Sequence, residues 1–521
     1  MKRSYSSGIA FALASFGSIG VATLATSILT ARIYGVTVVG EAALALAPVA
    51  IVTLLSTVRE QPAMVRVIAK LPARDPAVTG ISFAVFCFSF ALTAVVSAIG
   101  VGASYLVFHG PIDHPDLFEP AAAALTGYVL IVNTCWNADG VLGAFRAGRE
   151  LFAVRLHQAL VYAALIVGFS FVSRSVWSLT LAFLISWATA LVHRLALLPR
   201  VMRLRVPRRE LRAGFGELRE IVTFGLKITP GSIAGGLSDS SGTWILGATS
   251  SVAAVGAFSR AQNVAARLSE LNWRVTEMLL PTLVERQTAG DRAGSDRVVA
   301  DSLRYAAFGM LLPAAVGAGA SNAVMGIFGS DFQAADAALC WLLLVPWLQT
   351  LTAIQGVVLM AGNQPIWTTY AQVTRLAVTL AIGIPLTLAI GLTGMGVALA
   401  GGCLASLGVY AVIMRARAAM PHPGARRLAR QLAGLGAAYA GGFFAARLVD
   451  DQLSGVGGLL LALLAGSIAF VLLALAVAGT TARDRERVRQ LRRAVRARWS
   501  GRRSAQARPS DPPARPQDVA Q

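Results

Sequence analysis

The chain has 521 residues, of which 55% are hydrophobic and only 14% are charged. A soluble protein carries about 25% charged residues, so the long apolar runs of this chain are predicted to span a membrane. The formal net charge of +20 comes from Arg and Lys residues concentrated between the apolar runs and in the tail. No basic face with interleaved aromatic residues stands free of the apolar runs, so nucleic-acid binding is not expected.

The first six apolar runs are each long enough to cross a bilayer, which takes about 20 residues. They comprise residues 8–31, 37–57, 79–108, 120–144, 156–172 and 176–198. The link after the second run is rich in Arg, so the positive-inside rule predicts that it is cytoplasmic. The link at 109–119 is acidic and is predicted to be external. The first run is too long for a signal peptide, so it is expected to remain as a span.

A basic stretch at 201–220 is the strongest boundary in the chain and is predicted to be a cytoplasmic linker between an N-lobe (1–200) and a C-lobe (221–415). Two more helices (416–480) and a basic cytoplasmic tail (481–521) follow. Pro and polar residues dominate the end of that tail, so part of it is expected to be disordered. The eight later spans are predicted at 221–247, 252–284, 305–328, 337–361, 366–390, 395–414, 432–449 and 456–479.

Fourteen spans place every Arg-rich link and both termini on the cytoplasmic side and every acidic link outside. If the segment 252–284 did not cross while the segment before it did, every later link would invert. The Arg-rich link at 415–430 would then be external, against the rule. The remaining alternative is that both 221–247 and 252–284 stay out of the membrane, which leaves twelve spans.

An internal repeat argues against that alternative. Four glycines recur at near-constant offsets of 212, 216, 216 and 214 residues: Gly35 as Gly247, Gly40 as Gly256, Gly140 as Gly356 and Gly148 as Gly362. This spacing indicates that spans one to six are copied in spans seven to twelve. Because both copies begin inside, they are parallel repeats. The predicted fold is therefore an all-α integral membrane protein of about 14 transmembrane helices, with two parallel six-helix repeats plus two C-terminal helices.

This arrangement resembles the polysaccharide-transporter branch of the multidrug/oligosaccharidyl-lipid/polysaccharide exporter superfamily over about residues 1–480. The residues that carry the resemblance are Thr30–Gly35 with Gly40, Gly143–Gly148, and Val255–Ala261. It implies a flippase in the bacterial inner membrane that moves undecaprenyl-diphosphate-linked oligosaccharide by alternating access. It also implies partner polymerases and glycosyltransferases of O-antigen, capsule or exopolysaccharide assembly. The alternatives are a flippase for the lipid-linked peptidoglycan precursor and a cation-coupled multidrug antiporter.

One helix face in the segment 252–284 carries an unusual density of charge. With about 100° per residue, six polar side chains fall within about 100° of arc. Five charges at roughly 2.5–3.5 kcal/mol each forbid a lipid-facing position at mid-depth. The stripe therefore lines an aqueous cavity that holds the diphosphate, pairs internally at i,i+3 and i,i+4, or lies on a surface. Its members are Arg260, Asn263, Arg267, Glu270, Arg274 and Glu277.

Further charges within or beside the spans are candidates for the same cavity. Arg32, Lys227 and Arg375 are predicted to add positive charge, with snorkelling to the interface as the alternative for Lys227. Asp239 and Asp139 are the deepest acids outside the stripe and are candidates for ion or proton coupling. For Asp139 an ion pair at the helix end, with Arg146 nearby in sequence, is the alternative.

The sequence offers no enzyme signature. The longest external link, 109–119, holds only three acids and two His, and the chain contains no Gly-rich phosphate loop. The four cysteines lie within apolar runs without metal-ligand spacing, so no metal and no cofactor are expected. In the tail, apolar residues recur at helical spacing among Arg, so the tail is predicted to lie on anionic membrane lipids or to be solvated.

Overall fold

The structure is a computed structural model that describes residues 5–145, 147–203, 205–227, 229–362, 364, 366–416, 425–453 and 455–478. Every regular element in these residues is helical. The principal helices are α1 (Tyr5–Leu55), α2 (Glu60–Ile68), α3 (Pro76–Phe108), α4 (Phe118–Ala144), α5 (Gly148–Ser170), α6 (Val176–Leu197), α7 (Arg208–Leu226), α8 (Thr229–Thr249), α9 (Val252–Thr288), α10 (Arg292–Gly319), α11 (Ser321–Gly326), α12 (Asp336–Leu342), α13 (Leu344–Ala361), α14 (Ile366–Ala416), α15 (Ala425–Asp450) and α16 (Gly455–Leu473).

The predicted all-α membrane fold with about 14 spanning helices is confirmed. Nine described segments are long and apolar enough to cross a membrane. Two of them, α1 and α14, are each a pair of helices joined at a kink, at Gly35 with φ 75° and at Gly391 with φ 58°. The more polar helices α8, α9 and α10 have 21, 37 and 28 residues, which is also enough to span. The described part of the chain therefore holds 14 helices of membrane-spanning length.

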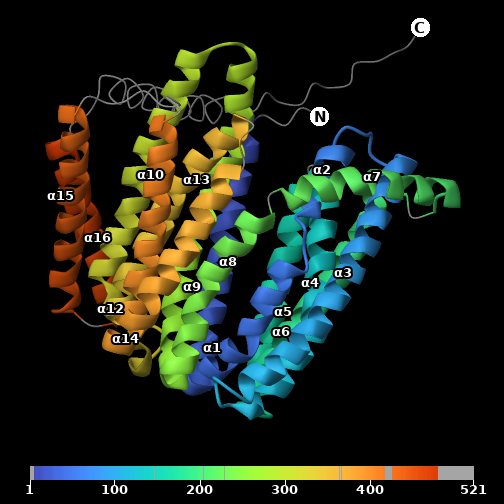
Figure 1. Ribbon diagram of the computed structural model, residues 1–521. Coiled ribbons are helices and arrows are strands. Elements are labelled where there is room, and N and C mark those ends of the chain that lie inside the picture. Colours follow the sequence, from blue (N-terminus) through green and yellow to red (C-terminus); the bar gives the residue numbers. More distant parts are fainter. Residues whose placement is uncertain are drawn as a thin grey trace, which may run out of the picture.

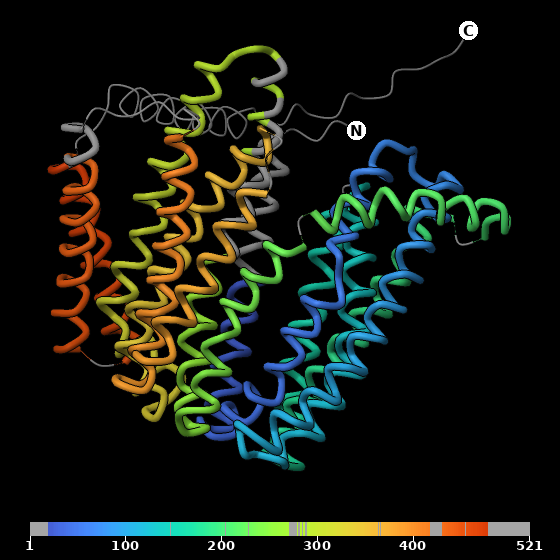
Figure 2. The backbone as a smooth tube through the Cα atoms, in the orientation of Figure 1, coloured from blue at the N-terminus to red at the C-terminus, as the bar shows by residue number. Residues whose placement is uncertain are grey.

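The helices form two lobes with a pair of helices beside the second (Figure 1). The second half of α1 packs with α3–α6 in the N-lobe, and α8–α14 form the C-lobe. The pair α15–α16 packs against α10 on the outer side of the C-lobe. The lobes converge where α1 kinks and α9 begins, and their helix axes diverge toward the end that carries α2 and α7 (Figure 2).

The linker between the lobes forms a helix of its own, which corrects the predicted start of the seventh span. Residues 208–226 form α7, which lies across the end of the N-lobe and packs on α3, with Gly80 and Gly214 in backbone contact. The membrane-length helix is α8, from Thr229 to Thr249, and not 221–247. Pro230 explains the break, since a proline starts a helix readily but cannot donate a backbone hydrogen bond within one.

The lobes meet through two glycines that the repeat makes equivalent. A Cβ on Gly40 would lie 2.0 Å from the carbonyl oxygen of Val252, and one on Gly256 would lie 2.1 Å from that of Val36. Only glycine permits so close an approach of two helix backbones. A contact between equivalent residues is what an approximate two-fold axis between the repeats produces.

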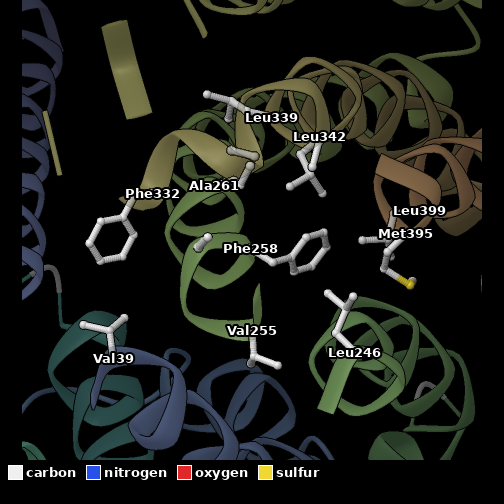
Figure 3. Close-up of a cluster of buried hydrophobic side chains, with 14 of the residues drawn as sticks. Val39, Leu246, Val255, Phe258, Ala261, Phe332, Leu339, Leu342, Met395 and Leu399 are labelled. Atoms are coloured by element: carbon white, nitrogen blue, oxygen red, sulfur yellow. The ribbon is translucent and has the colours of Figure 1, made fainter. Parts of the chain in front are cut away.

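The apolar core around this crossing joins both lobes. Phe258 of α9 is fully buried and points toward Leu246 of α8 and Met395 of α14 (Figure 3). Val39 of α1 and Val255 of α9 belong to the same cluster. The core therefore places α9 with one side on the C-lobe interior and its first turns against α1.

The predicted tail, residues 481–521, and its interaction with anionic lipids lie outside the described residues. Arg146, the neighbour considered for Asp139, lies outside them as well. The predicted domain division remains a prediction.

A candidate site between the two lobes

The polar stripe of α9 begins at the crossing of the lobes. Arg260 is eight residues beyond Val252, so it lies about 12 Å along the helix. Its Nη1 donates a 2.7 Å hydrogen bond to Ser27 Oγ of α1. Its Nε is buried and has no hydrogen-bond partner among the described residues. No described carboxylate forms an ion pair with Arg260 in this part of the structure.

Asn263 and Arg267 follow on the same arc of α9, and both side chains are half-buried. Arg267 is 15 residues beyond the start of the helix, about 22 Å along its axis. The side chains of Glu270, Arg274 and Glu277 lie outside the described residues, although the helix backbone continues through them. The alternative of internal Arg–Glu pairing on α9 therefore remains a prediction.

A second polar face lies beside the stripe on α9, and the sequence analysis missed it. Gln262 Nε2 donates to the Asp239 carbonyl oxygen at 2.6 Å, and Ser269 Oγ donates to Gln349 Oε1 at 3.1 Å. Gln349 Nε2 in turn donates to Asp239 Oδ1 at 3.3 Å. Gln262 and Ser269 lie seven residues apart, which indicates one helix face. This face ties α9 to α8 and α13 within the C-lobe.

Asp239 and Arg375 form an ion pair across α8 and α14. Arg375 Nη2 donates to Asp239 Oδ1. The arginine side chain is only 5% exposed, whereas that of Asp239 is 52% exposed. Arg375 Nε is buried without a hydrogen-bond partner among the described residues. The structure thus joins two predicted site residues that lie 136 positions apart.

Asp139 is also paired, but with a residue that the sequence analysis did not select. Arg194 of α6 donates to it through Nε at 2.7 Å and Nη2 at 3.3 Å, in a bidentate arrangement. The side chains are 3% and 13% exposed for Arg194 and Asp139. The Arg194 guanidinium also lies over the Trp187 ring, 5.9 Å from its centroid. A charge within the apolar run 176–198 was the available signal for Arg194.

Arg32 connects α1 to the C-lobe at the end where the lobes converge. Its Nε and Nη2 donate to the carbonyl oxygens of Ile327 and Gly326, at 2.8 and 2.9 Å. These carbonyls lie at the end of α11, where a helix leaves its last acceptors without internal partners and attracts cations. Arg32 is therefore a polar bridge between the repeats.

Lys227 and Arg59 lie apart from the stripe, near the end that carries α2 and α7. Lys227 is exposed at the end of α7 and borders a shallow depression of about 460 Å³ with Arg219 and Phe224. Arg59 precedes α2 with φ 55°, and burial lowers the pKa of its guanidinium while the neighbouring Glu60 opposes this. Among the described residues, His, Cys, Asp and Glu form no group of three that could hold a metal ion.

A family model described as "Polysaccharide biosynthesis protein" matches residues 84–336. The sequence matches no curated protein. The structure is similar to "Lipid II flippase MurJ, inward closed conformation", with a TM-score of 0.68, 10% identity, and coverage of 90% of this chain and 98% of that one. The fold is that of the MATE and lipid II flippase transporters. The predicted resemblance to the polysaccharide-transporter branch is thereby confirmed.

Two further structures share this transporter fold. An inward-facing multidrug resistance MATE family transporter of the MOP superfamily matches with a TM-score of 0.60 and 16% identity, over 77% of this chain and 95% of that one. A MOP superfamily transporter from Pyrococcus furiosus, described by a reverse polarity of its binding pocket, matches with a TM-score of 0.52 and 13% identity, over 77% and 95%. This chain is accordingly a multi-pass membrane protein with the MOP transporter fold.

Proposed function

We propose that this protein is a flippase that moves undecaprenyl-diphosphate-linked oligosaccharide across the bacterial inner membrane. The observation that carries the proposal is Arg260, a guanidinium at the interface of the lobes without a described carboxylate partner. A charge within a membrane is costly and marks a function unless it is paired. A diphosphate supplies negative charge, and the planar fork of arginine binds phosphate oxygens bidentately.

The stripe on α9 suits a lipid that carries its charge between an apolar tail and a polar sugar. Arg260 and Arg267 lie about 10 Å apart along the helix axis, which gives the anion two successive positions. Asn263 lies between them and offers an uncharged donor and acceptor for sugar hydroxyls. Glu270, Arg274 and Lys227 would extend the path toward the end that carries α7, with the lipid tail remaining in the bilayer.

The arrangement of the lobes supports alternating access, since their helices converge at one end and diverge toward the other. The basic residues in and beside α2 and α7 favour a cytoplasmic position for the end where the lobes diverge, and an even number of spans would put both termini on that side. Arg32 and the Gly40–Gly256 crossing would close the external side. Glycosyltransferases would supply the substrate and a polymerase would consume it on the opposite face.

Flipping of a fluorescent undecaprenyl-diphosphate oligosaccharide in reconstituted vesicles tests the proposal. Replacing Arg260 by Ala removes a charge-assisted contact worth about 1.5–3 kcal/mol, so flipping should slow about tenfold or more. Arg260→Lys should retain part of the rate, since it keeps the charge without the fork. Arg447→Ala, which removes an exposed ion pair with Asp451 on α15, serves as the control. Equal rates in Arg260→Ala and the control would contradict the role of the stripe.

A flippase for the lipid-linked peptidoglycan precursor is the second candidate. The similarity to the lipid II flippase extends over 90% of this chain, against 77% for the multidrug transporter. Both lipid substrates carry a diphosphate, so the arginine stripe does not separate them. The same vesicles, loaded with fluorescent lipid II in place of the oligosaccharide lipid, would distinguish the two by the faster substrate.

A further inference from the structure

Asp239 is placed where a membrane transporter would bind a coupling ion. It lies ten residues from either end of α8, about 15 Å along the helix and thus near the bilayer midplane. It is one helical turn from Gly236, whose position contacts Leu54 of α1, so it lies on the side of α8 that faces the N-lobe. A half-exposed carboxylate at this depth is the kind of group that ordinarily exchanges a cation.

Polar side chains lie next to both members of the Asp239–Arg375 pair on α8 and α14. Ser238 Oγ and Thr379 Oγ1 lie 3.2 Å apart, next in sequence to Asp239 and one turn from Arg375 respectively. Gln349 Nε2 donates to the carboxylate at 3.3 Å, while its amide oxygen accepts from Ser269 Oγ at 3.1 Å. A carboxylate is a ligand that hard cations prefer. The Asp239 carboxylate is therefore the cation ligand here, and the cation that it meets is the guanidinium of Arg375.

We infer that Arg375 is a tethered cation that takes the place of an exchangeable alkali cation at Asp239. An arginine cannot be deprotonated in a protein, so its charge is always present. The side chain is also held in place, since it is only 5% exposed and bonded to Asp239. Asp239 is neutralised from within the protein, and the C-lobe needs no Na⁺ there.

This assignment replaces the predicted ion-coupling role of Asp239 with an internal pair. Only one consequence of the inference rests on the proposed function, namely that flipping does not depend on a Na⁺ gradient. The cation site itself can be tested without any substrate, through the thermal stability of the purified protein. Failure of the site and failure of the flippase proposal are therefore distinguishable.

The test compares unfolding of the purified chain in equal concentrations of sodium chloride and choline chloride. Arg375→Gln should have a lower Tm than the wild type in choline, and sodium should raise it by about 3 °C or more, because a bound ion stabilises the folded state. The wild type and the double variant Asp239→Asn/Arg375→Gln should respond equally to both salts. Arg194→Gln, which breaks the other buried ion pair, should lose stability without a specific sodium response.

A sodium-specific stabilisation of the wild type, or no sodium response in a folded Arg375→Gln variant, would overturn the inference. If Arg375→Gln does not fold, Asp239→Asn provides the complementary measurement. That variant leaves the guanidinium without its anion, so chloride should stabilise it more than gluconate does. Equal stability of this variant in chloride and gluconate would then contradict the inference that the Arg375 guanidinium acts as the cation at Asp239.

Discussion

Arg194, Arg260 and Arg375 lie within membrane-length helices, where an unpaired charge costs about 2.5–3.5 kcal/mol or more. Arg194 and Arg375 are each paired with an aspartate on another helix. Arg260 instead donates to a serine and retains a buried donor without a described partner. The two paired arginines are therefore neutralised within their lobes, and Arg260 at the interface between the lobes is the one of the three that we propose binds an anion.

The Asp139–Arg194 pair should behave as a structural element of the N-lobe. Arg194→Ala leaves the Asp139 carboxylate buried without its partner, which should lower the free energy of unfolding by about 3–5 kcal/mol. Thermal unfolding of the purified protein measures the effect. Removing the exposed Arg447–Asp451 pair should cost less than about 1 kcal/mol. Similar losses in the two variants would show that Asp139 gains water or another partner.

At the scale of the element, α9 combines roles that usually belong to different helices. Its first turns carry the glycine that contacts α1, one face carries the arginine stripe, and the other face is bonded to the C-lobe. Because Gln262 and Ser269 hold the helix to α8 and α13, the stripe keeps a defined position relative to the C-lobe. Movement of the lobes would then alter the contacts of α9 with α1 and leave those with the C-lobe unchanged.

The close approach of α1 and α9 predicts an unusual sensitivity to one methyl group. Gly256→Ala places a Cβ against the Val36 carbonyl oxygen and should destabilise the protein by about 1–3 kcal/mol. The control is Gly408→Ala on α14, where a Cβ meets no atom within 4 Å. There the better helix propensity of alanine should make the change neutral or slightly stabilising. Equal Tm values for the two variants would contradict the crossing.

At the scale of the whole molecule, the lobes meet at one end through the glycine crossing, a shared apolar core and the Arg32 bridge, with a further contact between Leu54 of α1 and Gly236 of α8. Two such lobes can rotate about this contact with little change inside either, because each has a core of its own away from it. This is the physical basis on which a fold of two repeats exposes a central site alternately to either side.

The bridge formed by Arg32 should limit opening at the converging end. In a cysteine-free background, Ala261→Cys lies in the buried core of the crossing and should react slowly with an impermeant thiol reagent. Adding Arg32→Ala removes two hydrogen bonds between the repeats and should speed labelling about 5-fold, as expected for a change near 1 kcal/mol. Arg447→Ala should leave the rate unchanged. An unaltered rate in the Arg32 variant would show that the apolar contact alone holds this end closed.

The sequence by itself determined the all-α membrane fold and its number of about 14 spans, and it predicted the two repeats and the exclusion of the arginine stripe from lipid. These properties depend on local hydropathy, on periodicity along one helix and on the cost of charge in a membrane, and all three can be read without knowledge of which helices touch. The notable local error was the start of the seventh span, where the amphipathic helix α7 and the break at Pro230 precede α8.

Only the tertiary structure decided which charges are paired. Arg375 meets Asp239 across 136 positions and Arg194 meets Asp139 across 55, and neither spacing has a signature in the sequence. The same holds for Gln262 and Ser269, whose polar face matters only because α8 and α13 pack against it. Such pairs depend on the crossing angles and depths of separate helices. These angles and depths are determined by the sum of many weak packing contacts, which the residue pattern of a single segment does not contain.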